Sequence, residues 1–225
     1  MNRYSGLVTA AKNPGRAASL PATLAYAEAF TAESEGAERA RQRAAEFGIE
    51  PISTGVAAVL TFLARTVSAR AVAEIGTGTG VSGLALLAGM AADGVLTSID
   101  SETENQVAAR EVLTAQGIAS RRIRLIAGQA LNVLAKLTDG AYDIVYVDGD
   151  PLEYVEYVAQ AERLLRSGGL LIVHHALWQG LVADERNFDD EPLIIREALA
   201  AVIDDGSFTP VLLPVGDGLL VAVKA

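Results

Sequence analysis

Residues 71–83, AVAEIGTGTGVSG, give the clearest indication of the fold of this chain. The first five residues form a short, largely apolar run of the kind that makes a buried strand. Three glycines follow at Gly76, Gly78 and Gly80, and glycine lets the backbone turn sharply and lets a ligand approach closely. A helix-forming run comes next, and the N-terminus of a helix offers unpaired N–H groups. The stretch therefore predicts a strand, a tight turn and a helix, with a ligand at the turn.

Strands and helices alternate on both sides of this unit. Strands are expected at 71–75, 94–99, 122–127, 142–147 and 170–174, and helices at 81–92, 103–117 and 151–169. This alternation predicts a parallel sheet with helices on both faces. The segment 208–225 instead has two apolar runs about Gly216–Asp217–Gly218, which is typical of a hairpin. The final strand pair should therefore be antiparallel.

The first fifty residues differ in texture from the rest. Pro21 suits the first turn of a helix, and the polar, alanine-rich run 31–47 forms a second helix that Gly48 can end. We expect residues 1–50 to form a helical arm, which lies either on the main domain or on a partner subunit. Residues 51–225 then form a single α/β domain.

Composition excludes several classes of protein. The 225 residues carry 18 Lys and Arg against 28 Asp and Glu, and a net charge of -10 disfavours binding to nucleic acid. The absence of cysteine excludes disulfides and thiolate metal sites. The N-terminus lacks the apolar core of a signal peptide, and no apolar run approaches the ~20 residues that span a bilayer. We expect a soluble, cytoplasmic protein that binds neither membrane nor nucleic acid.

Two ligands suit the glycine turn. A dinucleotide would use Gly78-x-Gly80-x-x-Gly83, whereas S-adenosylmethionine carries an amino-acid end in place of a pyrophosphate. Glu74, two residues before the first glycine, would repel a pyrophosphate but would suit an ammonium group. Asp100, which closes the second strand, can accept ribose hydroxyls in either case. Without a ligand, Glu74 would be an unpaired buried charge, which is costly. The pattern therefore favours S-adenosylmethionine.

Five segments occur in an order and spacing that carry a family resemblance. They are EIGTGTGVSGLALL, LTSIDSETE, YDIVYVDGDPLEYVEY, LLRSGGLLIVHHALWQG and LLPVGDGLLVAVK. From about Ile52 to the C-terminus the chain resembles the catechol and caffeoyl-CoA type of S-adenosylmethionine-dependent O-methyltransferase. The resemblance implies a Rossmann-like class I methyltransferase fold. Its mostly parallel, seven-stranded sheet has the order 3-2-1-4-5-7-6, strand 7 is antiparallel, and helices lie on both faces.

The same resemblance implies a set of cofactor contacts. Glu74 and its neighbours would hold the methionine end, Asp100 the ribose, and Ala130 would lie beside the adenine, while Asp148 would face the sulfonium and its methyl group. The complete set of expected cofactor residues is Ile52, Glu74, Gly76, Thr77, Gly78, Ser82, Asp100, Ala130 and Asp148.

The reaction centre departs from the family's pattern. The family usually holds a divalent metal through an aspartate at the position of Asp148 and an adjacent Asp-Asn pair that ends the fifth strand. A lysine three residues after the first aspartate serves as the base. This chain keeps Asp148 but has His174-His175 in place of the pair and Pro151 in place of the lysine.

Three interpretations of the histidines stay open. With Asp148 they could bind a metal, for which imidazole favours iron, zinc, manganese or nickel over magnesium. One imidazole could instead replace the missing lysine as base, or the pair could be the polar end of a buried strand. Successive strand side chains point to opposite faces, so both rings converge only if the strand breaks at His174. We favour the base, with Asp148, His174 and His175 as the catalytic residues and the metal doubtful.

The predicted function is S-adenosylmethionine-dependent O-methylation of a small hydroxylated acceptor, such as a phenol or catechol. One alternative is a protein that binds this cofactor without transferring methyl groups, and another is a nicotinamide-dependent oxidoreductase. The family is commonly dimeric and the helical arm offers a contact surface, so we also expect a homodimer.

Overall fold

A single seven-stranded sheet organises the computed structural model, which describes residues 17–204 and 206–225. The strand order is β3-β2-β1-β4-β5-β7-β6, with β7 antiparallel to both of its neighbours. This confirms the predicted topology. The strands are β1 (Ala71–Ile75), β2 (Val95–Asp100), β3 (Ile123–Ala127), β4 (Tyr142–Val147), β5 (Leu165–Val173), β6 (Phe208–Leu213) and β7 (Leu219–Lys224).

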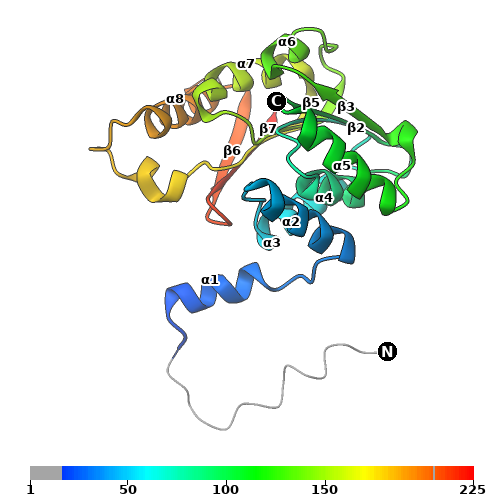
Figure 1. Cartoon of the computed structure of the whole chain (residues 1–225). Helices are drawn as coiled ribbons and strands as arrows, with labels where there is room; N and C mark the ends of the chain where they lie inside the picture. The colour runs from blue at the N-terminus through cyan, green and yellow to red at the C-terminus, as the bar shows by residue number, and fades with distance from the viewer. Residues whose placement is uncertain (1–16, 205) are drawn as a thin grey trace.

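Helices cover both faces of the sheet (Figure 1). They are α1 (Leu20–Glu28), α2 (Glu35–Phe47), α3 (Thr54–Thr66), α4 (Val81–Gly89), α5 (Thr103–Ala115), α6 (Ala130–Leu134), α7 (Tyr154–Leu164) and α8 (Asp190–Asp204). Short 3-10 helices span Ser120–Arg122, Pro151–Glu153 and Trp178–Ala183. Side chains of β1 alternate between two apolar cores, because Val72 packs on the α3–α4 side and Ala73 on the α7–α8 side.

The start of β5 differs from the prediction, which continued a helix to Gly168–Gly169. Helix α7 ends at Leu164, and β5 begins at Leu165, opposite Tyr142. The register then shifts, so that Leu170 pairs with Ile144 and the glycines form a bulge in the strand. Gly168 has a φ of +72°, which glycine adopts without strain. Two adjacent glycines thus mark a β-bulge here, where the sequence suggested a helix end.

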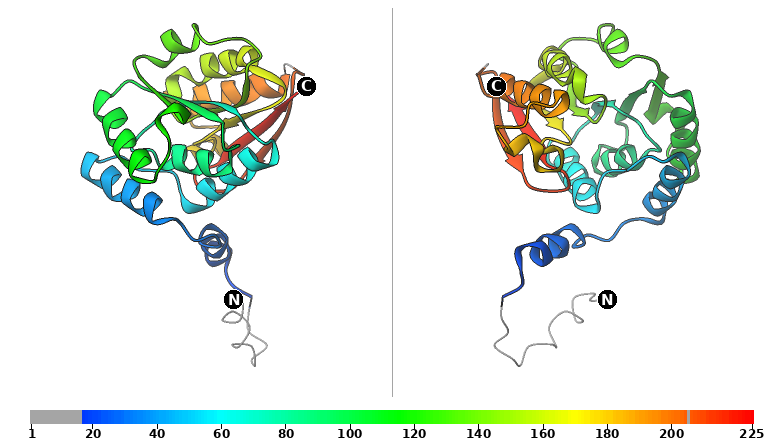
Figure 2. Two further views of the ribbon diagram at one scale, coloured as in Figure 1. Left: turned by 90° about the vertical axis from the view of Figure 1, so that its right-hand side faces the viewer. Right: turned by 60° about the vertical axis from the view of Figure 1, so that its left-hand side comes forward.

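The two N-terminal helices behave differently. Helix α2 buries Gly36, Ala37, Ala40 and Ala44 against the body of the molecule, and Gly48 ends it in a left-handed conformation. Helix α1 buries none of its residues and projects away from the body (Figure 2). Residues 1–16 of the predicted arm lie outside the described residues.

The parallel register gathers four strand ends at one edge of the sheet. Ile75 is opposite both Ile99 and Val147, and Val147 is opposite Val173. The residues that follow these ends are therefore neighbours, which is where open α/β sheets bind ligands. Within the described ranges, no helix is long and apolar enough to cross a membrane.

Candidate active site

The glycine turn after β1 packs directly against the end of β4. Gly76, Gly78 and Gly80 have φ values of +90°, +48° and +90°, a region that glycine tolerates and other residues rarely adopt. A Cβ atom at Gly76 would lie 2.1 Å from the carbonyl oxygen of Asp148. The turn can therefore approach the reaction centre only with glycine at position 76.

Asp100 holds this turn from the adjacent strand. Its Oδ2 accepts hydrogen bonds from the backbone N–H groups of Thr77, at 3.1 Å, and Gly78, at 2.9 Å. The side-chain amide of Asn105 donates to both oxygens of the same carboxylate. A pyrophosphate would need the turn N–H groups that Asp100 already occupies. The geometry therefore disfavours a dinucleotide at this turn.

Glu74 lies beneath the turn, fully buried. Its Oε2 accepts a hydrogen bond from Ser98 Oγ at 2.5 Å, Ser98 Oγ lies 2.6 Å from Thr77 Oγ1, and Gln106 Nε2 donates to Thr77 Oγ1 at 2.8 Å. The other carboxylate oxygen of Glu74 has no hydrogen-bond partner among the described residues.

The pKa of Glu74 is raised from 4.5 to about 7. Burial is the main cause, the hydroxyls of Ser82 and Ser98 oppose it, and the charges of Asp148 and Asp100 add to it. Glu74 does not line the cavity above the turn. Ser98 and Thr77 connect Glu74 to the lining of that cavity, and its direct contact with the cofactor stays a prediction.

A cavity of about 300 Å³ lies above the turn. Seven of the predicted cofactor residues line it: Ile52, Gly76, Thr77, Gly78, Ser82, Asp100 and Asp148. Ala130 lines a second cavity, of about 390 Å³, and shares it with Gly76, Asp100 and Asp148. Ala130 and these seven residues therefore line two neighbouring cavities at the same edge of the sheet.

The histidine pair follows a break in β5. The strand ends at Val173, the N–H of His174 still donates to the carbonyl of Val147, and His175 has a φ of +54°. This left-handed residue turns the chain, so that the two rings lie on the same side with centroids 4.0 Å apart. The two rings were expected to converge only if the strand breaks at His174, and the strand does end immediately before that residue.

His174 is the more buried member of the pair and is 3% exposed. Its Nδ1 lies 2.9 Å from Asp148 Oδ1, and the other oxygen of that carboxylate accepts a hydrogen bond from Tyr146 Oη at 3.1 Å. Tyr154 donates to the carbonyl of His174, also at 3.1 Å. Burial raises the pKa of both tyrosines, so they remain neutral donors.

Asp217 completes the centre, and the sequence reasoning missed it. Its Oδ2 lies 2.8 Å from His175 Nδ1, and its Oδ1 accepts the N–H of Gln179 at 2.5 Å. For Gly216–Asp217–Gly218 the sequence indicates only a hairpin turn. The signal was that strand 7 adjoins strand 5 in the predicted order, which brings this turn close to the histidines.

Comparison with known proteins places these features in a family. A model of the O-methyltransferase family matches residues 32–225. The chain belongs to the O-methyltransferase family. This confirms the predicted family and enzyme class.

Individual relatives agree with this membership. A candidate O-methyltransferase of Mycobacterium sp. (strain KMS) is 45% identical over 215 residues, or 96% of each protein. A solved Corynebacterium glutamicum protein is 31% identical with a TM-score of 0.85, over 91% of this chain and 96% of that one. The O-methyltransferase TomG of Streptomyces achromogenes, involved in tomaymycin synthesis and solved with S-adenosylmethionine, is 26% identical with a TM-score of 0.82. That match covers 91% of this chain and 96% of TomG.

The side chains at the family's metal position can converge on one ion. Asp148, His174 and His175 each offer a ligand atom, and these atoms lie within 4.8 Å of one another. His175 Nε2 lies 3.7 Å from Asp148 Oδ1, a spacing that a shared metal ion could bridge. One carboxylate and two imidazoles suit a transition metal better than magnesium. The site therefore fits a transition metal such as iron or zinc better than magnesium, which prefers oxygen ligands.

A further cavity of about 400 Å³ adjoins the first on the side of the hairpin. Its lining residues are Glu50, Pro51, Ser53, His174, His175, Gln179, Gly216 and Asp217. No Lys or Arg is among these described lining residues. Glu50, Pro51 and His175 line both this cavity and the one above the glycine turn. His175 therefore lies where the two cavities meet.

Proposed function

We propose that this protein transfers the methyl group of S-adenosylmethionine to a hydroxyl oxygen of a small aromatic acceptor, such as a phenol or catechol. The observation that carries the proposal is the position of His175 between the two cavities. The family membership and the S-adenosylmethionine complex of the related TomG support the choice of cofactor.

The cofactor would occupy the cavities around the glycine turn. Asp100 would meet the ribose, Ala130 the adenine, and the carboxylate of Asp148 would face the cationic sulfonium, which an anionic lining attracts. The acceptor would occupy the cavity of Ser53, His174 and Asp217. Because the described residues of that lining include no Lys or Arg, a neutral or cationic acceptor fits better than an anionic one.

His175 is the proposed base. An ionised Asp217 only accepts hydrogen bonds, so the proton of His175 lies on Nδ1 and Nε2 is left as the acceptor. Nε2 takes the hydroxyl proton while the oxygen attacks the methyl carbon in line. The carbon–sulfur bond breaks, its electron pair stays on sulfur, and S-adenosylhomocysteine leaves. Asp217 stabilises the imidazolium, and His174 fixes the carboxylate of Asp148.

A metal at Asp148, His174 and His175 is the second candidate, favoured by the convergence of their ligand atoms. It would supply stabilisation of the acceptor oxyanion. Elemental analysis after purification without chelator distinguishes metal-assisted from metal-free methyl transfer. Stoichiometric metal and loss of activity with chelator would overturn the metal-free proposal.

The first test replaces each histidine. His175→Ala should lower kcat by at least about a hundredfold and leave the affinity for S-adenosylhomocysteine nearly unchanged, because the base acts only in the chemical step. His174→Ala should have a smaller effect, since that ring acts through Asp148. Unchanged turnover in both variants would contradict the proposal that a histidine is the base. Cofactor binding without turnover on any catechol or phenol would favour a binding protein.

We also propose that residues 1–50 form an arm, that 51–225 form the catalytic domain, and that the protein is a cytoplasmic homodimer. Helix α1 supports the dimer, since it buries none of its residues, and Leu20, Tyr26 and the adjacent Phe30 are 71%, 59% and 67% exposed. Such apolar surface is typical of an interface. Light scattering on the full chain checks the mass.

A further inference from the structure

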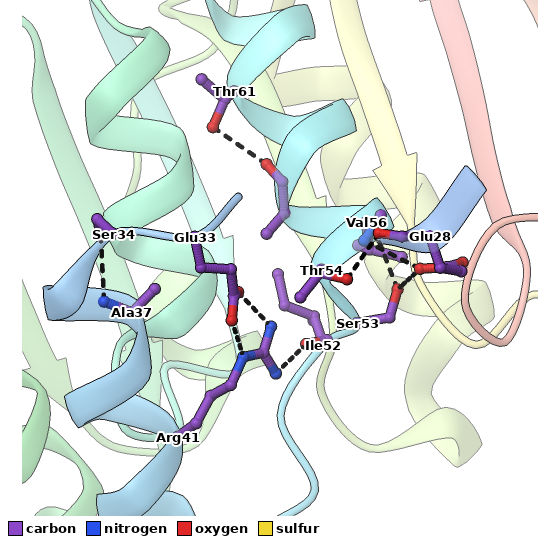
Figure 3. Close-up of polar contacts among 12 residues, drawn as sticks. Glu28, Glu33, Ser34, Ala37, Arg41, Ile52, Ser53, Thr54, Val56 and Thr61 are labelled. Carbon is purple, nitrogen blue, oxygen red and sulfur yellow. Dashed lines mark hydrogen bonds and ion pairs between the residues drawn. The ribbon is translucent and has the colours of Figure 1, made fainter. Parts of the chain in front are cut away.

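Helix α1 is fastened to the body through its last residue, Glu28 (Figure 3). Oε2 of Glu28 accepts hydrogen bonds from Ser53 Oγ at 2.7 Å and from the N–H of Gly55 at 2.9 Å. Oε1 accepts the N–H of Gly216 at 2.6 Å. The main-chain oxygen of Glu28 accepts from Thr54 Oγ1 at 2.7 Å. One carboxylate therefore joins α1, the start of α3 and the turn of the β6–β7 hairpin.

Gly55 packs closely against the Glu28 carboxylate, and Gly216 packs closely against α3. A Cβ atom at Gly55 would lie 2.3 Å from Glu28 Oε2, and a Cβ atom at Gly216 would lie 2.7 Å from Val56 Cγ2. Gly216 also has a φ of +56°, which other residues rarely adopt. The hairpin turn is therefore seated directly on the first turn of α3, with the carboxylate between them.

The residue after Gly216 is Asp217, which holds the His175 ring at 2.8 Å. The same turn also binds the loop after β5 through its backbone. The N–H of Leu177 donates to the carbonyl of Asp217, and the N–H of Ala176 to the carbonyl of Gly218. A displacement of the turn would therefore move the His175 ring and its loop together.

The electrostatic setting favours an ionised Glu28. Burial acts to raise its pKa, but the hydrogen bonds from Gly216, Ser53 and Gly55 outweigh burial and leave the pKa below its ordinary value. The carboxylate also lies at the N-terminus of α3, where a negative charge is favoured. A charged acceptor makes stronger hydrogen bonds than a neutral one.

We propose that Glu28 is a positioning residue of the reaction centre: it fixes the hairpin turn that carries Asp217 and, through Asp217, the orientation of the His175 ring. This inference rests on the proposed function where it concerns catalysis. It gives the N-terminal helix a role in the chemistry, although no residue of α1 lines the acceptor cavity.

The test uses two variants of the full-length protein. Glu28→Ala removes all three carboxylate hydrogen bonds. Glu28→Gln keeps the shape, but only one of its two terminal atoms can accept, so either Gly55 or Gly216 loses the partner for its N–H. Glu35→Gln is the matched control, because Glu35 is an exposed carboxylate on α2 whose one ion pair among the described residues is with Arg39, at 3.9 Å.

The first readout is independent of activity. The chain has only two histidines, so ring nitrogen NMR of the 15N-histidine protein contains two ring systems, and His174→Gln assigns them. Wild type and Glu35→Gln should show His175 protonated on Nδ1. Both Glu28 variants should show a mixture of tautomers or a shifted Nδ1 resonance. An unchanged His175 spectrum in a folded Glu28→Ala protein would overturn the inference.

The second readout is a double-mutant cycle with Asp217→Asn. Glu28→Ala should lower kcat about ten- to a hundredfold, as expected for a displaced catalytic group, with S-adenosylhomocysteine affinity unchanged. In the Asp217→Asn background the same change should have little further effect, because both residues act through one ring. Fully additive losses would contradict the inference. If His175→Ala stays active while the Glu28 variants alter the His175 spectrum, the role of Glu28 in positioning the ring is supported. The proposal that His175 is the base is then contradicted.

Discussion

At position 175 a left-handed backbone conformation directs an imidazole between two carboxylates, Asp217 at 2.8 Å and Asp148 at 3.7 Å. Non-glycine residues with such a φ are uncommon, and they often mark functional positions. The sequence showed that Asp148 and the histidines end neighbouring strands. The expected strand order placed the hairpin turn near the histidines, but it could not give the Asp217–His175 contact, because that contact spans 42 residues and depends on how the turn packs.

Glu74 is the residue on which the choice of ligand depends. The sequence predicts its carboxylate beside the ammonium group of the cofactor, and that contact stays a prediction. The side chain is buried beneath the turn, where Oε2 accepts from Ser98, while Asp100 takes the turn N–H groups. Which neighbours a buried side chain takes at a strand end depends on packing that a single motif does not encode.

The raised pKa of Glu74 predicts a dependence of stability on pH. The folded protein binds this proton more tightly than the unfolded chain, so the stabilisation is present below pH 4.5 and is lost as the pH rises toward 7. The free energy of unfolding should fall by about 1.4 kcal/mol per pH unit in this window. Denaturant unfolding of wild type and Glu74→Gln measures the slope. If the free energy of unfolding depended on pH in the same way in both proteins, the raised pKa of Glu74 would be contradicted.

Gly76→Ala should damage both stability and cofactor binding. The added Cβ would lie 2.1 Å from the carbonyl oxygen of Asp148, at a backbone φ of +90°. Strain and overpacking of this kind cost about 1–3 kcal/mol each. Thermal unfolding and calorimetry with S-adenosylhomocysteine should both show a loss. Gly140→Ala is the control, since Gly140 also has a positive φ, +62°, but apart from its chain neighbours no atom of the described residues lies within 4 Å of the added Cβ.

Among the elements, β1, β4 and the final hairpin were the most predictable. Their apolar runs are bounded by glycine or by polar residues, and tertiary contacts only reinforce the pattern. The start of β5 was not predictable, because Arg166 inside the bulge reaches back to Asp143 at 2.6 Å and draws the chain into the sheet. Helix α1 could be predicted as an element, whereas its attachment through Glu28 could not.

Helices α3 and α4 meet at a contact that tolerates only glycine. A Cβ at Gly89 would lie 2.2 Å from the carbonyl oxygen of Thr61. Gly89→Ala should therefore separate the two helices and lower the free energy of unfolding by about 1–3 kcal/mol. The adjacent exposed Ala88, changed to Ser, is the control. Equal unfolding midpoints for the two variants would show that this contact is not tight.

For the sheet as a whole, the strand order was predictable from the family resemblance, and the alternation of strands and helices was visible without it. Subunit association involves a second copy of the chain, so the homodimer stays a prediction that rests on the exposed apolar residues of α1. Substituting Leu20 and Tyr26 with Ser should convert the proposed dimer to a monomer, since apolar contacts dominate such interfaces. Sedimentation measures the change, and a wild-type protein that is already monomeric would contradict the dimer.

The proposed function depends on methyl transfer that His175 assists without a metal. Its most direct test is the rate of S-adenosylhomocysteine formation by metal-free wild type and His175→Ala, each supplied with S-adenosylmethionine and a panel of catechols and phenols. We expect turnover by wild type and a rate at least about a hundredfold lower for the variant. Equal rates for the two proteins, or wild-type activity that appears only when a divalent metal is restored, would contradict it.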